Sequence, residues 1–174
     1  MDTSFSHKKV ISIISAKSDM GKTTLIEGLI RIFKSKGYRL GVLKYDVKKF
    51  EIDKEGKDSY RFTEAGADTM IIASAKKLAM IERFKEEESI ESVIDRFKSM
   101  DLIIIEGFKS NGYPQIEVHR KGREAELLIN SSEFDSSNII AVATDERLED
   151  IKLPQLDLND VEKVACFIEE NVIK

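Results

Sequence analysis

The residues best suited to chemistry lie close together near the N-terminus, between an apolar run and a helix-like pattern. Gly21, Lys22 and Thr23 follow the β-branched run Val10–Ile14, and apolar residues then recur at a helical spacing from Leu25 to Phe33. A strand, a loop and a helix in this order is the layout of a P-loop, whose backbone N–H groups and lysine surround a phosphate chain. The hydroxyl of Thr23 is then expected to hold a magnesium ion.

The predicted P-loop departs from the usual signature, Gly-x-x-x-x-Gly-Lys-Ser/Thr. Ala16 stands in place of the first glycine, and this matters only if the position needs a positive φ. Asp19 places a negative charge inside a loop that would bind an anion. Lys17 lies five residues before Lys22, where a subgroup of P-loop proteins carries a lysine that reaches a nucleotide across a dimer interface. A solvated loop lysine explains Lys17 equally well.

A second group of candidates follows the buried strands. Glu106 and Gly107 come directly after the fully apolar run Leu102–Ile105. A carboxylate there can hold magnesium or orient an attacking water, which makes Glu106 the candidate catalytic residue, and Gly107 would let the backbone approach a terminal phosphate. Asp145 follows the last buried strand and could accept hydrogen bonds from guanine. A helix cap or a turn is an equally good explanation for Asp145.

The composition indicates one domain over residues 1–174. Hydrophobic residues make up 41% of the chain and charged residues 34%, with only two prolines. The net charge of −4 gives no support to a nucleic-acid partner. The N-terminus has no apolar signal region and no run approaches ~18 apolar residues, so we expect a cytoplasmic protein without a membrane partner. Cys166 falls in an apolar helical pattern and is expected in the core, while His7 and His119 do not suggest a metal site.

Strands and helices alternate in the rest of the chain. The patterns predict strands at 39–44, 69–73, 78–81, 115–119 and 138–143, and helices at 59–66, from a Ser89 cap to 97, and over 161–172. The strand at 115–119 alternates polar and apolar residues, which places it at an edge. The fold class is therefore α/β, a three-layer, P-loop NTPase-like sandwich with a mostly parallel sheet and an antiparallel edge hairpin. Ligands in such sheets bind at the carboxyl ends of the strands.

Several motifs together resemble one known family. They are Gly21–Leu25, Gly37 with Val42–Lys44, Asp53–Ser59, Ala65–Ala67 and Asp101–Lys109. In order and spacing, from about Val10 to Asp145, the chain resembles the molybdopterin-guanine dinucleotide biosynthesis protein B family, usually called MobB. The resemblance implies a GTP-binding, weakly GTP-hydrolysing homodimer. It also implies an adaptor role for the MobA-type molybdenum-cofactor guanylyltransferase, which joins GMP to molybdopterin.

The resemblance carries roles to individual residues. It implies phosphate binding by Gly21, Lys22, Thr23 and Thr24, and magnesium chemistry at Thr23 and Glu106, with Asp53 as a third candidate metal ligand. Asp53, Lys57, Asp58 and Ser59 would lie in a loop that faces the nucleotide. Where family members carry histidines, this chain has Tyr45, Val47 and Lys48, so direct binding of molybdopterin is left open.

The leading hypothesis is a GTP-binding adaptor that requires Mg²⁺ and is at most a slow GTPase, because no clear water-orienting Gln or positioned Arg accompanies the P-loop. Arg61 is better explained by a surface salt bridge than as an arginine finger. One alternative is a small-molecule P-loop kinase, with 45–57 as an acceptor loop and Asp46 or Asp53 as general base. Another is a P-loop domain that binds nucleotide poorly and serves only as an interaction module.

Overall fold

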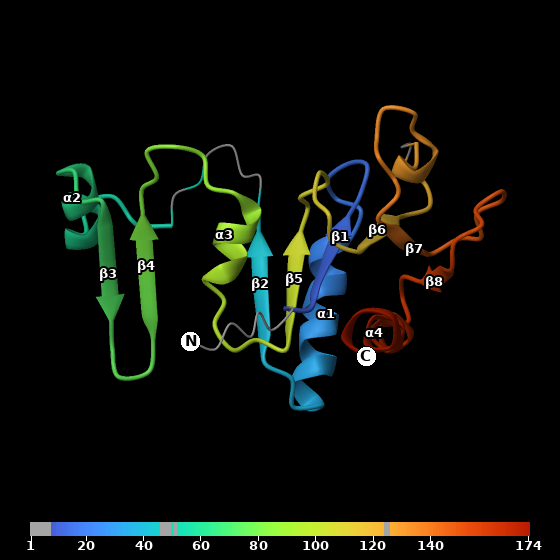
Figure 1. The fold of residues 1–174 in the computed structure, drawn as a ribbon, viewed down its shortest axis with the longest axis horizontal. Helices are drawn as coiled ribbons and strands as arrows, with labels where there is room; N and C mark the ends of the chain where they lie inside the picture. Colours follow the sequence, from blue (N-terminus) through green and yellow to red (C-terminus); the bar gives the residue numbers. More distant parts are fainter. Residues whose placement is uncertain (1–7, 46–49, 51, 124–125) are drawn as a thin grey trace, which may run out of the picture. The chain divides into compact units, whose positions relative to one another are not determined.

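The computed structural model describes residues 8–45, 50, 52–123 and 126–174. The chain forms two compact units (Figure 1). The first consists of Met1–Asp46 with Ile94–Lys174, and the second of Val47–Val93. That residues 1–174 act as one nucleotide-binding domain remains a prediction.

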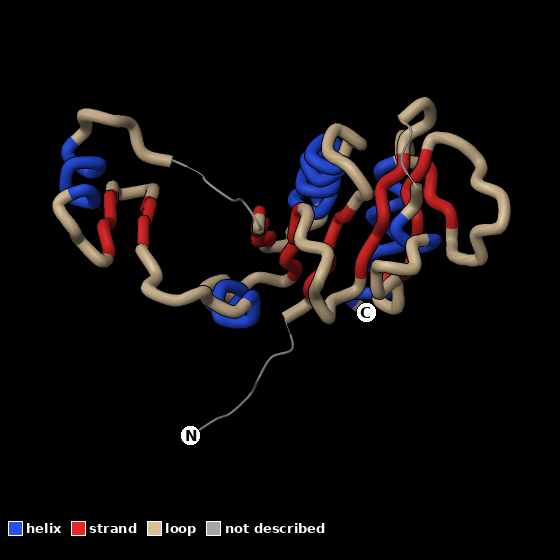
Figure 2. Tube along the Cα trace, turned by 90° about the horizontal axis from the view of Figure 1, so that it is seen from above, coloured by secondary structure: helices blue, strands red, loops and turns tan. Residues whose placement is uncertain are grey.

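The first unit is built on a parallel sheet. Its strands are β1 (Val10–Ile14), β2 (Leu40–Lys44), β5 (Leu102–Glu106), β6 (Gln115–His119), β7 (Ile139–Thr144) and β8 (Gln155–Asp157). They lie in the order β2-β5-β1-β6-β7-β8 (Figure 1), and every neighbouring pair is parallel. Figure 2 shows the strands in red and the helices in blue. The predicted, mostly parallel sheet is confirmed. β8 was not predicted from the sequence, because three residues are too few to show a period.

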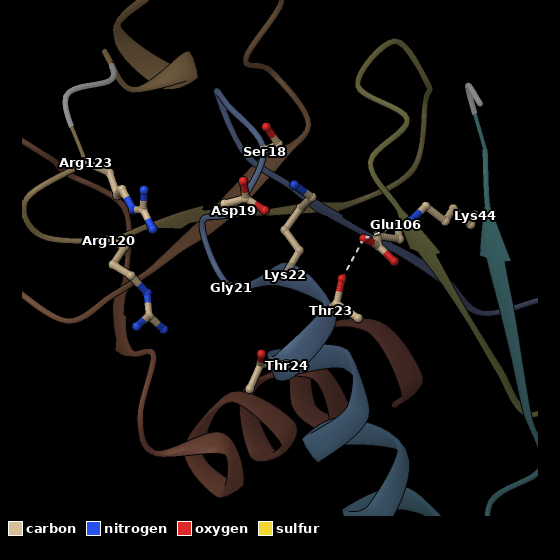
Figure 3. A pocket seen from close by; sticks show the side chains of 10 residues that line it. All are labelled: Ser18, Asp19, Gly21, Lys22, Thr23, Thr24, Lys44, Glu106, Arg120 and Arg123. Carbon is tan, nitrogen blue, oxygen red and sulfur yellow. Dashed lines mark hydrogen bonds and ion pairs between the residues drawn. The ribbon is translucent and has the colours of Figure 1, made fainter. Parts of the chain in front are cut away.

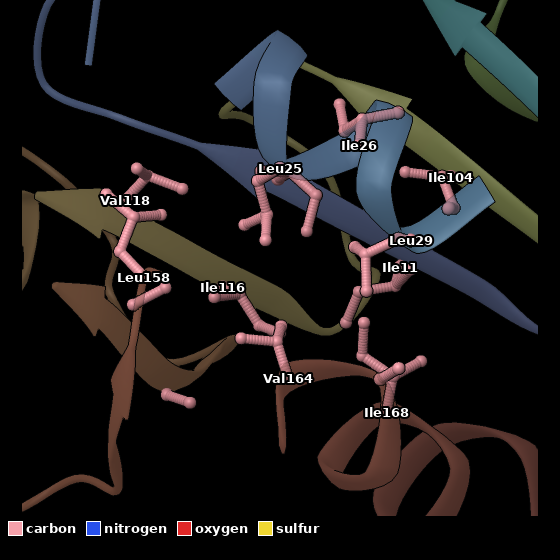
Figure 4. Packing of buried hydrophobic residues seen from close by; sticks show 14 of the residues in the cluster. Ile11, Leu25, Ile26, Leu29, Ile104, Ile116, Val118, Leu158, Val164 and Ile168 are labelled. Carbon is pink, nitrogen blue, oxygen red and sulfur yellow. The ribbon is translucent and has the colours of Figure 1, made fainter. Parts of the chain in front are cut away.

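Two helices pack on this sheet and on each other. α1 (Lys22–Ser35) and α4 (Val161–Ile168) share one buried cluster with strand residues such as Ile11, Ile104 and Ile116 (Figure 4). The chain continues after α4 as a π-helical turn, Glu169–Ile173. All of β1 is buried, as the apolar run Val10–Ile14 predicted. This central strand ends where the P-loop begins, so the loop starts from a rigid support.

One side chain of α4 is placed differently from the prediction. Cys166 is exposed, whereas the apolar pattern predicted that it lies in the core. The buried face of α4 is formed by Val164, Ala165 and Ile168, and a residue between these positions points away from it.

No described helix is both long enough and apolar enough to cross a membrane.

The predicted edge position of β6 is wrong. β6 pairs with β1 on one side and β7 on the other, and Gln115 and Glu117 are each only 1% exposed. The Glu117 carboxylate accepts hydrogen bonds from the backbone N–H groups of Leu128 and Ile129, at 2.7 and 3.2 Å, in the 3-10 turn η1 (Leu128–Asn130). Buried polar residues with partners thus produced the alternation that usually marks a solvated face.

The second unit contains α2 (Asp58–Glu64), β3 (Thr69–Ala73) and β4 (Leu78–Glu82), and α3 (Ile90–Asp95) spans its boundary with the first. The predicted antiparallel hairpin forms, but β3 and β4 make a two-stranded sheet of their own. Ser89 caps α3 as predicted, accepting a hydrogen bond from the Ser92 N–H at 3.2 Å. Arg61 makes a surface ion pair with Asp58 at 3.6 Å.

Candidate functional site

The P-loop connects β1 to α1 as the motif predicted. Gly21 is the N-cap of α1 and has a left-handed backbone with φ 98°, a conformation that glycine adopts without steric cost. The Lys22 ammonium donates a hydrogen bond to the Ser15 hydroxyl at 2.7 Å. That hydroxyl donates to the backbone oxygen of Lys17 at 2.5 Å. The lysine therefore curls back along its own loop, where a phosphate chain would lie.

The alanine at position 16, where the usual signature has its first glycine, causes no backbone strain. Among the described residues, the non-glycine positions with positive φ are Asp19, Ser99 and Asp150, so Ala16 does not need a glycine backbone. The strained position of the loop is Asp19, with φ 60°. The backbone oxygen of Ala16 accepts a hydrogen bond from the Lys109 ammonium at 3.1 Å. A lysine after β5 thus braces the loop where the usual signature has its first glycine.

Thr23, in the first turn of α1, meets Glu106 at the carboxyl end of β5. The Thr23 hydroxyl donates to Glu106 Oε1 at 2.9 Å (Figure 3). The Lys44 ammonium, at the end of β2, lies 3.9 Å from the same oxygen. Two oxygens that are adjacent ligands of one octahedral magnesium ion are separated by about 2.9 Å, given Mg–O distances of 2.0–2.1 Å. The donor set and its spacing therefore fit magnesium.

A cavity of about 490 Å³ opens over these residues. It is lined by Ser18, Asp19, Gly21, Lys22, Thr23, Thr24, Lys44, Glu106, Arg120 and Arg123. Four of these side chains are cationic and two are acidic, although the whole chain carries a net charge of −4. The local excess of positive charge favours an anionic ligand.

The electrostatics at Lys22 point the same way. Burial lowers the pKa of the Lys22 ammonium, and the neighbouring cations Lys109 and Lys44 lower it further, while Glu106 acts in the opposite direction. An anion beside Lys22 would stabilise its charged form and raise the pKa again. The position of Lys22 therefore favours a bound anion in the cavity.

Arg120 and Arg123 were not predicted from the sequence. Both lie in the turn that follows β6, where the Arg123 N–H donates to the Arg120 oxygen at 3.2 Å and Gly122 has φ 74°. Residues just after a parallel strand are expected near the ligand. Their place just after a strand could have identified both arginines. They were overlooked because the sequence analysis placed this strand at the edge of the sheet.

Other predicted site residues lie outside the cavity lining. Gly107 has φ 97° and donates its N–H to the Ile13 oxygen at 3.0 Å. Asp145 Oδ1 accepts a hydrogen bond from the Lys121 N–H at 2.7 Å, which is the turn role that the sequence had left open. Lys17 is exposed. For all three, nucleotide binding remains a prediction.

Asp53 belongs to the second unit. Its Oδ1 accepts hydrogen bonds from the Ser59 hydroxyl at 2.9 Å and from the Lys54 N–H at 2.8 Å, and its role as a metal ligand remains a prediction. Some residues named in the sequence analysis lie outside the described residues: His7, Asp46, Val47 and Lys48.

Comparison with known proteins decides the family. The family model described as "MobB: Molybdopterin guanine dinucleotide synthesis protein B" matches residues 10–145. This chain belongs to the MobB family. It is 37% identical over 164 residues to the molybdopterin-guanine dinucleotide biosynthesis adapter protein of Escherichia coli K12, covering 90% of this chain and 89% of that protein. The predicted family resemblance is confirmed.

Solved MobB structures have the same fold. A crystal structure of molybdopterin-guanine biosynthesis protein B has a TM-score of 0.73 and 32% identity, covering 92% of this chain and 98% of that one. The Bacillus subtilis MobB structure has a TM-score of 0.74 and 24% identity, covering 94% and 98% of the two chains, and supports the fold alone. The predicted P-loop NTPase-like α/β class is confirmed.

Proposed function

We propose that this chain is a cytoplasmic, GTP-binding adaptor that assists the attachment of GMP to molybdopterin, acting as a homodimer with a molybdenum-cofactor guanylyltransferase. Its membership of the MobB family and the name of the Escherichia coli relative support the adaptor role. The single observation that carries nucleotide binding is the cationic cavity over the P-loop, with Thr23 and Glu106 paired at 2.9 Å on one side of Lys22.

Each part of the cavity has a task in this proposal. The N–H groups at the start of α1 and the Lys22 ammonium bind the phosphate chain. Thr23 and Glu106 hold Mg²⁺, which neutralises charge on the terminal phosphates when it is bound. The described lining residues include no glutamine, and of their two carboxylates, Asp19 and Glu106, we assign Glu106, beside Thr23, to orienting a water. The sequence suggested no arginine near the P-loop, whereas Arg120 and Arg123 line the cavity; both lie on the other side of Lys22 from Glu106 (Figure 3), so we still expect slow GTP hydrolysis.

Nucleotide binding is tested by isothermal titration of the full chain with GTP and with ATP, in the presence of Mg²⁺. We expect GTP to bind more tightly than ATP, and the Lys22→Ala variant to lose most of the affinity for both. Lys152→Ala, which removes an exposed lysine far from the P-loop in sequence, is the matched control and should bind GTP normally. Equal or tighter binding of ATP would contradict the guanine preference.

The adaptor role is tested with a purified guanylyltransferase, molybdopterin and Mg²⁺-GTP. Adding this chain should increase the yield of molybdopterin guanine dinucleotide, and the Lys22→Ala variant should increase it less. A yield that does not change when the unmodified chain is added would contradict the adaptor role.

A further inference from the structure

The guanidinium of Arg120 lies directly against the P-loop. Its Nη2 is 3.0 Å from the position that a Cβ atom would occupy at Gly21. The absence of a side chain at Gly21 is what permits this approach. The Nε of Arg120 is buried and has no hydrogen-bond partner within the described part of the chain. A buried donor without a partner costs free energy, which an incoming acceptor would recover.

The residues on either side of Arg120 contact the segment that follows β7. Asp145 Oδ1 accepts a hydrogen bond from the Lys121 N–H at 2.7 Å, and His119 Nε2 lies 3.1 Å from Glu146 Oε1. These contacts lie on both sides of Arg120 in the chain, so its backbone is held at the cavity before any ligand arrives. A guanidinium, with its planar set of donors, is well suited to binding a phosphate.

The two arginines and the metal candidates flank Lys22 on different sides. In Figure 3, Arg120 and Arg123 lie on one side of Lys22, whereas Glu106 and Lys44 lie on the other, where Thr23 contacts Glu106. In a P-loop, the lysine reaches the β- and γ-phosphates and the threonine hydroxyl holds the metal bound to them. The side of Thr23 and Glu106 therefore receives the terminal phosphates. The side of Arg120 is left for the phosphate next to the nucleoside.

We propose that Arg120, assisted by the exposed Arg123, binds the phosphate next to the nucleoside and thereby sets the affinity for nucleoside di- and triphosphates alike. This inference rests on the proposed function of the cavity as a nucleotide site. It differs from an arginine finger, which contacts the transferred terminal phosphate and acts on the rate of hydrolysis. Asp145, the candidate residue for guanine recognition, accepts its hydrogen bond from Lys121 in the same turn. The turn after β6 and Asp145 would then bind the base and the phosphate next to the nucleoside together.

The test is the affinity of the Arg120→Ala variant for GTP and for GDP, each titrated into the full chain with Mg²⁺. Loss of a charge-assisted contact should weaken both by about 10- to 100-fold, and by the same factor. Arg120→Lys should recover part of the loss, because it restores the charge without the planar donor set. Arg123→Ala should show a smaller loss of the same kind, since its side chain is exposed.

Arg31→Ala is the matched control, because it removes the same charge from an exposed side chain of α1, which pairs with Glu27 at 3.5 Å. Its affinities for GTP and GDP should equal those of the unmodified protein. A loss of GTP affinity with GDP affinity spared would overturn the inference, because it would place Arg120 at the terminal phosphate. Unchanged affinities in Arg120→Ala and Arg120→Lys would overturn it too, and would leave the proposed function standing as long as Lys22→Ala abolishes binding. If the unmodified chain does not bind GTP, both proposals fail.

Discussion

The two walls of the cavity differ in chemistry and in how they are built. We call Thr23, Glu106 and Lys44 the metal wall, and Arg120 and Arg123 the arginine wall. In the metal wall, Glu106 and Lys44 end β5 and β2, Thr23 lies in the first turn of α1, and the oxygens of Thr23 and Glu106 are 2.9 Å apart. The arginine wall is a turn after β6 and offers guanidinium donors. Under the proposed nucleotide function, this difference predicts that one end of a bound phosphate chain depends on metal and the other end does not.

The largest expected effect separates these two ends. Glu106→Gln removes a charged oxygen from the metal wall and should weaken the Mg²⁺ affinity of the GTP complex by about 10- to 100-fold. In EDTA, the same variant should bind GTP at least as tightly as the unmodified protein, because the Glu106 carboxylate repels phosphate when no metal lies between them. The measurement is GTP affinity across a magnesium titration.

Arg120→Ala should show the reverse pattern, with a loss of GTP affinity that is similar with and without magnesium. Glu149→Gln, at an exposed glutamate, serves as the control and should follow the unmodified protein throughout. The same magnesium dependence in Glu106→Gln and Arg120→Ala would remove the distinction between the walls.

The metal wall could be predicted from the sequence because its signals are local. The Gly21-Lys22-Thr23 motif lies between an apolar strand and a helical pattern, and Glu106 ends a strand without polar residues. The arginine wall could not be predicted, because recognising it requires knowing that β6 is internal. The polar residues Gln115 and Glu117 made β6 look like an edge strand. Only the folded chain shows that both are buried with partners: the Lys109 oxygen for Gln115, and the N–H groups of Leu128 and Ile129 for Glu117.

Glu117 lies in β6, the strand that leads to the arginine wall, and its protonation should make the stability of the fold depend on pH. Burial raises the pKa of its carboxyl above the ordinary value of 4.5, although the Leu128 and Ile129 N–H groups oppose the shift. A raised pKa means that the protonated form is the better tolerated one in the fold. The stability that Glu117 contributes is therefore fully present below its ordinary pKa and is lost as the pH rises through the raised value.

Glu117→Gln should remove this dependence, because glutamine does not titrate. We expect the unfolding free energy of the unmodified protein, relative to the variant, to be highest at acid pH and to decline toward neutral pH. Urea unfolding of both proteins between pH 4 and 8 measures it, with Glu149→Gln as the control for an exposed glutamate. A difference that grows as the pH rises would show that the two backbone hydrogen bonds outweigh burial.

The smallest expected effects lie in the P-loop, between the two walls. Asp19 has a left-handed backbone and a negative charge at the cavity, whereas Ala16 has neither feature. Asp19→Gly should therefore raise GTP affinity by about 3- to 10-fold, by relieving backbone strain and removing repulsion of phosphate. Asp19→Asn removes the charge while tolerating the same backbone, so it separates the two causes.

Ala16→Gly is the matched change at the position where the usual signature has glycine, and it should alter GTP affinity by less than about 2-fold, because the backbone there already suits alanine. Titration of the three variants with Mg²⁺-GTP decides the comparison. If Ala16→Gly improved binding more than Asp19→Gly, the missing glycine itself would limit the loop. If Asp19→Gly and Asp19→Asn improved it equally, the charge of Asp19 would be the whole cause and its backbone strain would play no part in phosphate binding.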